Sequence, residues 1–166
     1  MISGRGEPQR LELTSFGGIA YDTDVEARRV VLDTSVIVAS LRSRQGASFR
    51  LMSLLDQRRF EAAVSVPLVF EYEDALERYV ETGLYSQSDV DHVLDYLCQI
   101  GHRQRIFFLW RPYLPDAKDD MILELAFAAN CEGIVTHNRR DFVGTDRLGI
   151  RVYTPKEFLQ ILEQKP

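Results

Sequence analysis

Four acidic residues, Asp33, Glu71, Asp120 and Asp141, each stand close behind an apolar stretch and could do chemistry together if the fold brings them into one pocket. Like charges in one pocket repel one another, and protonation, basic partners or cations must relieve that repulsion. Hard carboxylate oxygens without a supporting Cys/His cluster favour Mg²⁺ or Mn²⁺, with water completing the coordination. Such ions activate a water and stabilise a leaving oxygen, so converging acids predict phosphoryl-transfer chemistry that needs no serine, cysteine or histidine nucleophile.

Small polar residues stand beside these acids. Thr34 and Ser35 come directly after Asp33, where either could also cap the following helix. Thr136 and Asn138 follow a later apolar stretch and could hold a water on the metal or a scissile phosphate. They could equally serve as turn residues, and both interpretations stay open at this point.

Each acid also has an ordinary structural interpretation. Asp33 could be a turn residue at a strand end. Glu71 could be a first-turn acid that faces a helix dipole, as could Asp120 or the adjacent Asp119. Asp116, just ahead of that turn, is more typical of a solvated loop charge. One at a time these interpretations are favoured, but four acids at corresponding positions favour a shared site.

The element that must position Asp33 is an apolar, β-branched run. Val30, Val31 and Leu32 have no polar residue alternating with them, which is typical of a strand buried on both faces of a parallel sheet. Further strands are predicted at 60–66, 106–110, 133–136 and 150–153, and helices at 36–41, 48–57, 68–82 and 119–130, with two more opening behind cap residues at 86 and 154. Strands that alternate with helices predict a parallel sheet with right-handed crossovers.

This arrangement places Asp33, Glu71, Asp120 and Asp141 at equivalent points. Each falls just after a strand or in the first turn of the helix that follows one. The carboxyl ends of parallel strands share one edge of the sheet, and open α/β sheets bind their ligands there. We therefore expect the four acids to gather at that edge.

The composition fits one globular unit with a tail. The chain has 166 residues, of which 45% are hydrophobic, enough for a substantial core. Residues 1–28 carry glycines, a proline and scattered charges without a sustained period, so we expect a poorly ordered extension ahead of one domain over 29–166. A net charge of −5 argues against a protein that coats nucleic acid through bulk electrostatics. It does not exclude a nuclease, because bound divalent ions reverse the local field.

Compartment and redox state follow from what the chain lacks. No apolar run approaches the roughly 20 residues needed to span a bilayer, and the N-terminus has no basic-then-apolar secretion signal. We expect a cytoplasmic protein without membrane contact. Cys98 and Cys131 have no further ligand at metal-binding spacing, and we expect reduced, buried thiols in helical stretches.

Residues 31–35 read Val-Leu-Asp-Thr-Ser, which resembles the opening motif of the PIN-domain ribonucleases, an apolar strand that ends in Asp-Thr/Ser-Ser/Asn. Glu71 matches the glutamate that this family carries in the helix after the second strand. Asp120, sixteen residues before Thr136, matches the third acid, which opens a helix rich in alanine. Asp119 is an adjacent candidate for the same position.

The closing motif is the most specific of the set. Residues 135–142 read Val-Thr-His-Asn-Arg-Arg-Asp-Phe and match a Thr-x-Asn-x-x-Asp-Phe pattern, in which the fourth acid stands at the Asn138 or the Asp141 position. The resemblance covers about 30–162 and points in particular to the VapC-like toxins of bacterial and archaeal type II toxin–antitoxin pairs. Two features depart from it: residues 1–28 precede the usual start, and a loop with two prolines leads into Asp120.

The resemblance implies a three-layer α/β/α fold with a central, mainly parallel sheet of four to five strands. It also implies an endoribonuclease dependent on Mg²⁺ or Mn²⁺ that cleaves single-stranded RNA, forms a homodimer and is inhibited by a cognate antitoxin. Asp33, Glu71, Asp120 and Asp141 would be its catalytic and metal-binding acids, with Asp119 as a further metal ligand. The residues alone indicate only an α/β protein with a divalent-metal phosphoryl-transfer site.

Four arginines are candidates for contacts with RNA. Arg42, Arg44, Arg139 and Arg140 are expected around the same edge, where cationic groups would meet phosphates. Scattered arginines are more often solvated surface, so both interpretations remain.

Two other functions stay open. A PIN nuclease could serve RNA processing without an antitoxin, and a neighbouring small antitoxin gene would separate that role from a toxin. A Mg²⁺-binding signalling domain of receiver type also gathers acids at a sheet edge. That fold requires an acid pair after the first strand and a late lysine, whereas this chain offers Asp33 alone and places Lys156 and Lys165 in the C-terminal helix.

Overall fold

The chain folds around one parallel sheet. The structure, a computed structural model, describes residues 28–107 and 111–164. The strands are β1 (Arg29–Leu32), β2 (Glu61–Val64), β3 (His102–Arg103), β4 (Gly133–Val135) and β5 (Arg151–Tyr153). They pair in the order β3-β2-β1-β4-β5 with every neighbouring pair parallel, so the predicted parallel sheet is confirmed.

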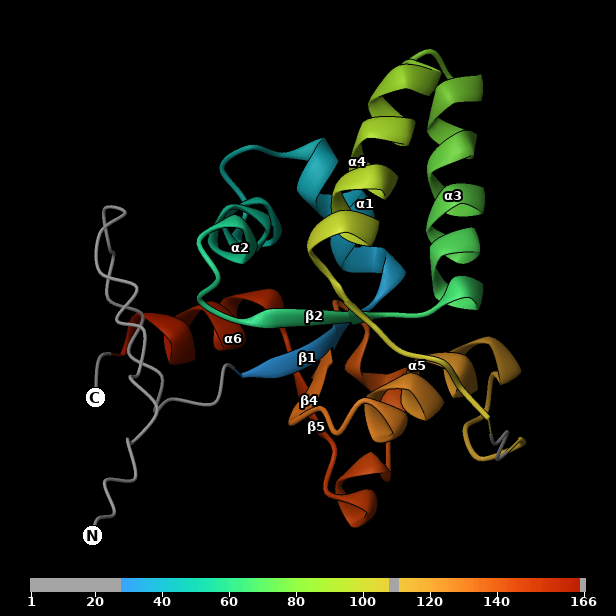
Figure 1. The fold of residues 1–166 in the computed structure, drawn as a ribbon, viewed down its shortest axis with the longest axis vertical. Helices are drawn as coiled ribbons and strands as arrows, with labels where there is room; N and C mark the ends of the chain where they lie inside the picture. The colour runs from blue at the N-terminus through green and yellow to red at the C-terminus, as the bar shows by residue number, and fades with distance from the viewer. Residues whose placement is uncertain (1–27, 108–110, 165–166) are drawn as a thin grey trace, which may run out of the picture.

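Helices cover both faces of the sheet (Figure 1). They are α1 (Thr34–Arg42), α2 (Ala47–Asp56), α3 (Val66–Glu81), α4 (Gln87–Ile100), α5 (Ala117–Ala128) and α6 (Pro155–Glu163), with the 3₁₀ turns η1 (Arg139–Phe142) and η2 (Thr145–Leu148). α1 packs on α2 and α3 packs on α4 along one face, while α5 lies on the other face against β1, β2 and β4. The expected three-layer α/β/α architecture is therefore confirmed.

The core is built on the central strand. Val30, Val31 and Leu32 of β1 are at most 1% exposed, as expected for a strand covered on both faces. α5 is buried along seven successive residues, from Asp120 to Ala126, so it has no exposed stripe there. Small alanine side chains let this helix lie close to the sheet, which explains why it can be buried all round.

The third strand lies earlier than the sequence predicts. Of the aromatic run at 106–110, Ile106 and Phe107 form no strand, and 108–110 lie outside the described residues. The strand is instead His102–Arg103, paired with β2. A Cβ on Gly101 would come within 2.5 Å of the Leu97 carbonyl oxygen and 3.1 Å of a Val64 methyl. Only glycine therefore lets α4 turn directly into the sheet.

The predicted helix caps are largely confirmed. Ser86 and Thr154 each close a capping box, with Asp89 and Glu157 as the reciprocal acids. α3 begins earlier than predicted, so Glu71 lies in its second turn and is not a first-turn acid. Its carboxylate therefore gains little from the helix dipole and must find other partners.

β1 occupies the switch point of the sheet. The chain leaves β1 through α1 and α2 toward β2 on one side, and it returns on the other side as β4 after crossing the opposite face in α5. Open parallel sheets have a crevice at such a point, beyond the carboxyl ends of the two diverging strands. Asp33 follows β1 and Thr136 follows β4, so both residues stand at this crevice.

Some expectations concern the periphery. Residues 1–27, most of the predicted extension, lie outside the described residues, and the boundary near 28 stays a prediction. In the described ranges, no helix is long and apolar enough to cross a membrane. Both cysteines are free thiols: Cys131 is buried just after α5, while Cys98 in α4 is only partly buried.

Candidate active site

Asp33 is held at the end of β1 by two hydroxyl groups. Its backbone N–H donates to the Val135 carbonyl oxygen at 2.9 Å, which ties the end of β1 to β4. Ser35 Oγ and Thr136 Oγ1 both donate to the same carboxylate oxygen, Oδ2, at 2.5 and 2.7 Å. Within 28–107 and 111–164 no group donates to Oδ1 of Asp33, so one oxygen of this largely buried carboxylate is left for a ligand.

Thr136 and Asn138 build the β4 side of the crevice. Thr136 is fully buried, and its Oγ1 accepts a hydrogen bond from the Asn138 backbone N–H at 2.9 Å while it donates to Asp33. Asn138 Nδ2 donates to Asp141 Oδ2. The two residues that compete for the fourth position of the closing motif are therefore bonded to each other.

Glu71 reaches the same crevice from α3. Thr34 Oγ1 donates to Glu71 Oε1 at 3.2 Å. Thr34 and Ser35 thus bind site carboxylates, and the prediction that one of them caps α1 is wrong. Burial raises the pKa of Glu71 above its ordinary 4.5, the Thr34 hydrogen bond opposes that rise, and the charge of Asp33 adds to it.

Asp120 faces away from the crevice. Its side chain is 1% exposed and accepts hydrogen bonds from the backbone N–H groups of Tyr113 at 3.1 Å and Leu114 at 2.7 Å. These bonds fasten the loop ahead of α5 to the first turn of the helix. The structure therefore places Asp120 where it holds backbone, at a position expected to carry a metal-binding acid.

Asp119 is the acid of α5 that meets the others. Burial raises its pKa from the ordinary 3.8 to about 7, assisted in turn by the negative charges of Asp141, Asp116, Asp33 and Glu71. Because these charges act on Asp119, its carboxylate lies close to the acids after β1, in α3 and after β4. The crevice thus brings Asp119, the adjacent candidate for the third position, into the surroundings of Asp33, Glu71 and Asp141.

A sequence model of the PIN domain matches residues 29–140. The chain belongs to the PIN domain family. Comparison with curated proteins gives no match. PIN domains are generally nucleases, hence hydrolases, and generally bind divalent metal ions. The family agrees with the parallel fold and the acidic crevice, and it sets aside the receiver-type alternative.

The donor set of this PIN domain fits a hydrated divalent ion. The crevice offers carboxylate oxygens, and neighbouring carboxylates add to the burial that raises the pKa of Asp119, so a cation is favoured there. Among the described residues, no three acidic, histidine or cysteine side chains already stand at the spacing of a full coordination sphere. Mg²⁺ usually keeps several waters and takes only one or two carboxylates, so Asp33, Glu71 and Asp119 need not close around it unaided.

Two charged residues of α5 belong to these surroundings, although the sequence pattern did not assign them to the site. Asp116 caps α5 by accepting from the Lys118 N–H at 2.9 Å, and its charge raises the pKa of Asp119. Lys118 lowers the pKa of Glu71, so it supplies positive charge close to the acids. Its place in the same helical turn as Asp119 is the signal that could have identified it.

The four arginines proposed as RNA contacts lie in different places. Arg139 forms an ion pair with Glu157 of α6 at 2.9 Å. Arg140 is exposed within the closing motif. α1 begins at the crevice and ends at Arg42, about 12 Å further along the helix axis. Arg42 and the following Arg44 therefore lie away from the crevice.

Proposed function

We propose that this PIN domain is a metal-dependent endoribonuclease that cleaves single-stranded RNA. The observation that carries the proposal is that Thr34, Ser35 and Thr136 hold the carboxylates of Asp33 and Glu71 at one edge of the sheet by hydrogen bonds. Burial and neighbouring carboxylates raise the pKa of Asp119 there to about 7. Such a site is unfavourable until a cation enters it. Phosphodiester hydrolysis is the reaction for which clustered carboxylates and divalent ions suffice without a nucleophile from the protein.

Asp33, Glu71 and Asp119 are the residues that would hold Mg²⁺ or Mn²⁺, with the bonded pair Asn138 and Asp141 at the fourth position. The bound ion would lower the pKa of the attacking water and stabilise the leaving oxygen. Asp120, which sequence reasoning places among the ligands, would act only through the loop that it fastens.

The neutral side chains of the crevice position these acids. Ser35 and Thr136 fix Asp33 by the same oxygen, which keeps the other oxygen turned to a ligand. Thr34 restrains Glu71 in the same way. Lys118 and Arg140 are the basic side chains best placed to meet phosphates beside the acids.

We further propose that the protein is a VapC-like toxin: a cytoplasmic homodimer inhibited by a cognate antitoxin. The support is the resemblance of residues 31–35 and 135–142 to the motifs of those toxins. RNA processing without an antitoxin is the alternative role for the same nuclease. A small antitoxin gene beside that of this protein would favour the toxin.

The test is cleavage of single-stranded and duplex RNAs in Mg²⁺, Mn²⁺ or EDTA. Asp33→Asn removes charge but not volume, so activity should fall by about 100-fold or more while circular dichroism stays that of the parent. Glu61→Gln makes the equivalent change at the opposite end of the strands, where Glu61 pairs with Arg29 at 2.7 Å, and should cleave like the parent. Parental activity in Asp33→Asn, or cleavage that survives EDTA, would contradict the proposal.

A further inference from the structure

A cavity of about 430 Å³ lies beside the acids, between the end of β2, the start of α3, α4 and the edge strand β3. We call it the β2–β3 pocket. Its walls include Ser65, Val69, Phe70, Cys98, Arg103 and Arg105. The volume is in the range of sites that bind small organic groups. None of these residues has a part in the cleavage chemistry proposed above.

The pocket wall contains an unsatisfied hydroxyl. Ser65 is 5% exposed, and across the described ranges its Oγ is the one buried side-chain polar atom without a hydrogen bond. Ser65 stands at the N-cap of α3, where a serine usually caps the helix, yet its side chain makes no cap bond. A buried polar group without a partner is unfavourable, so a ligand that fills the pocket gains by bonding to it.

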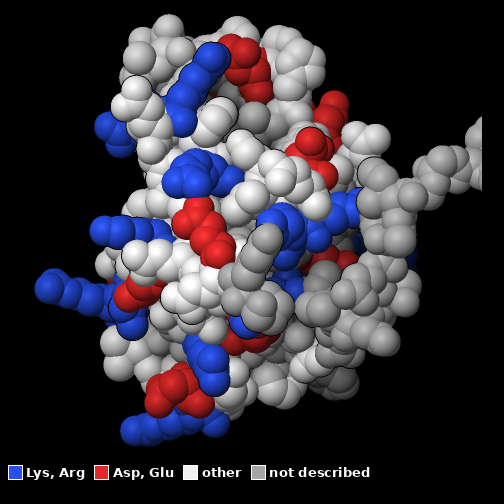
Figure 2. Space-filling view, turned by 90° about the vertical axis from the view of Figure 1, so that its left-hand side faces the viewer, with Lys and Arg blue, Asp and Glu red and all other residues white. Residues whose placement is uncertain are grey.

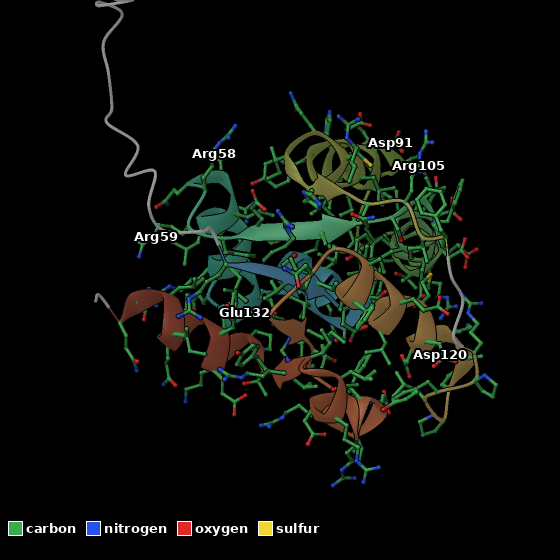
Figure 3. All side chains as sticks on the ribbon, turned by 60° about the horizontal axis from the view of Figure 1, so that its bottom comes forward. Arg58, Arg59, Asp91, Arg105, Asp120 and Glu132 are labelled. Atoms are coloured by element: carbon green, nitrogen blue, oxygen red, sulfur yellow. The ribbon has the colours of Figure 1, made fainter. Side chains whose placement is uncertain are left out.

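The rest of the pocket combines an aromatic wall with a positive rim. Phe70 is 60% exposed. Arg103 and Arg105 are exposed, and in the part of the chain that the structure describes neither guanidinium pairs with a carboxylate. Figure 3 shows Arg105 toward the same end of the sheet as Asp120, with Arg58 toward the other end. An exposed ring beside unpaired arginines suits single-stranded nucleic acid, which offers bases to stack and phosphates to bind.

The pocket and the acidic crevice lie at the same edge of the sheet, and α3 contributes residues to both. Phe70 directly precedes Glu71 in α3. Ser65 follows β2 at the edge where Asp33 follows β1, and the two strands are parallel neighbours. A nucleic-acid strand with one phosphate at the acids would therefore carry an adjacent nucleotide to this pocket.

We propose that the β2–β3 pocket holds the base of a nucleotide next to the cleaved phosphodiester and so sets the sequence preference of cleavage. The inference rests on the proposed ribonuclease function and names a substrate contact for it. The base stacks on Phe70 and bonds to Ser65 Oγ, while Arg103 and Arg105 meet the flanking phosphate. Because the four bases differ in their donors and acceptors, the Ser65 hydroxyl favours one over the others.

Cys98 reports occupancy of the pocket directly. The chain has two cysteines, and burial raises the pKa of Cys131 to about 12, so a thiol reagent reacts with the partly exposed Cys98. In EDTA, one of the four ribonucleoside monophosphates, or a tetranucleotide that contains it, should slow this reaction in a saturable way. Cys98→Ser provides the blank.

Two results of that experiment would contradict the proposal that the pocket binds a base. One is a Cys98 rate that none of the four nucleotides nor the RNA changes. The other is a rate that falls only as protein concentration rises, which would make the pocket a contact with a second copy of the chain.

Two substitutions test the chemistry of the pocket. Phe70→Leu should raise KM about fivefold or more with kcat little changed, because base stacking is lost and the acids are untouched. Ser65→Ala should keep cleavage but bring kcat/KM for the four bases closer together. Leu84→Ala changes an equally exposed apolar residue between α3 and α4 and should behave like the parent.

The outcomes separate this inference from the nuclease proposal. If the protein cuts no RNA but a nucleotide protects its Cys98, the proposal for the pocket stands and the nuclease proposal fails. If the protein cuts RNA but Phe70→Leu keeps the parental KM and Ser65→Ala keeps the parental base preference, the nuclease proposal stands and the proposal for the pocket fails. Because Ser65→Ala removes an unpaired hydroxyl, the variant should unfold at no lower temperature than the parent, which excludes misfolding as the cause of a lost preference.

Discussion

The two ends of the parallel strands carry charge in opposite ways. At the amino ends, Arg29 pairs with Glu61 at 2.7 Å and Arg28 pairs with Glu132 at 3.0 Å. Figure 2 shows the face on this side, with basic and acidic side chains interspersed. At the carboxyl ends burial and neighbouring acids instead raise the pKa of Glu71 and of Asp119, the latter to about 7.

This difference separates charges that are paired within the fold from the acids that we propose to be functional. Exposed ion pairs contribute only about 0–1 kcal/mol each, but they leave no charge in need of an external partner. Of the residues described, none forms an ion pair with Asp33, Glu71, Asp119 or Asp141. Acids without an ion-pair partner at the carboxyl end are what the proposed metal-dependent site requires.

The largest effect is expected at Asp119. Asp119→Asn removes one metal-binding charge at constant size, so kcat/KM for RNA cleavage should fall by about 100-fold or more. The same change relieves repulsion among the acids, so the metal-free variant should unfold at a higher temperature than the parent. Glu61→Gln, at the amino ends, should do neither. Parental activity in Asp119→Asn would contradict this role and indicate that Asp120 is the third acid of the site.

Asp120 lies near the carboxyl ends but is satisfied internally, like the charges at the amino ends. Its buried carboxylate accepts from the backbone of Tyr113 and Leu114. Asp120→Asn turns one acceptor oxygen into a donor that faces an N–H, so the free energy of unfolding should fall by about 2–3 kcal/mol. Urea denaturation measures this loss, which should be the same with and without Mg²⁺. A stability equal to the parent's would show that Asp120 does not hold the loop.

The position of the crevice follows from the sequence, and the choice among its acids does not. The apolar run ahead of Asp33 and the logic of parallel strands predict that Asp33 and Thr136 meet, and their side chains are 2.7 Å apart. Asp119 and Asp120 are adjacent on one helix and point about 100° apart. The sequence does not show which of them faces the sheet edge, because α5 is buried from Asp120 to Ala126 and has no exposed stripe there to orient it.

The third strand was hidden for a related reason. Aromatic residues at 106–110 are typical of a strand, while His102–Arg103 is too short and too polar to give a pattern. What places it is the contact of Gly101 with α4 and β2, a steric requirement between segments distant in the sequence. The pocket beside that strand was missed with it, because its walls come from four separate elements.

The raised pKa of Asp119 also makes the carboxyl end sensitive to pH, unlike the paired charges at the amino end. The folded, metal-free protein holds a proton on Asp119 between the ordinary pKa of 3.8 and about 7, where the unfolded chain has released it. The stability contributed by this group therefore falls as pH rises through that window and is constant above it. A divalent ion must displace the proton, so the apparent Mg²⁺ affinity should fall by up to about tenfold for each pH unit below 7.

Titration calorimetry near pH 6 and pH 8, in buffers of different ionisation enthalpy, measures both the affinity and the proton released. Asp119→Asn is the matched control, because it lacks the group that titrates: its Mg²⁺ affinity should be weak and nearly equal at the two pH values. A parental affinity that also stays constant, with no proton released, would mean that the acids after β1 and in α5 are as well compensated as the Arg29–Glu61 pair. The contrast between the two ends of the sheet would then be one of position and not of charge.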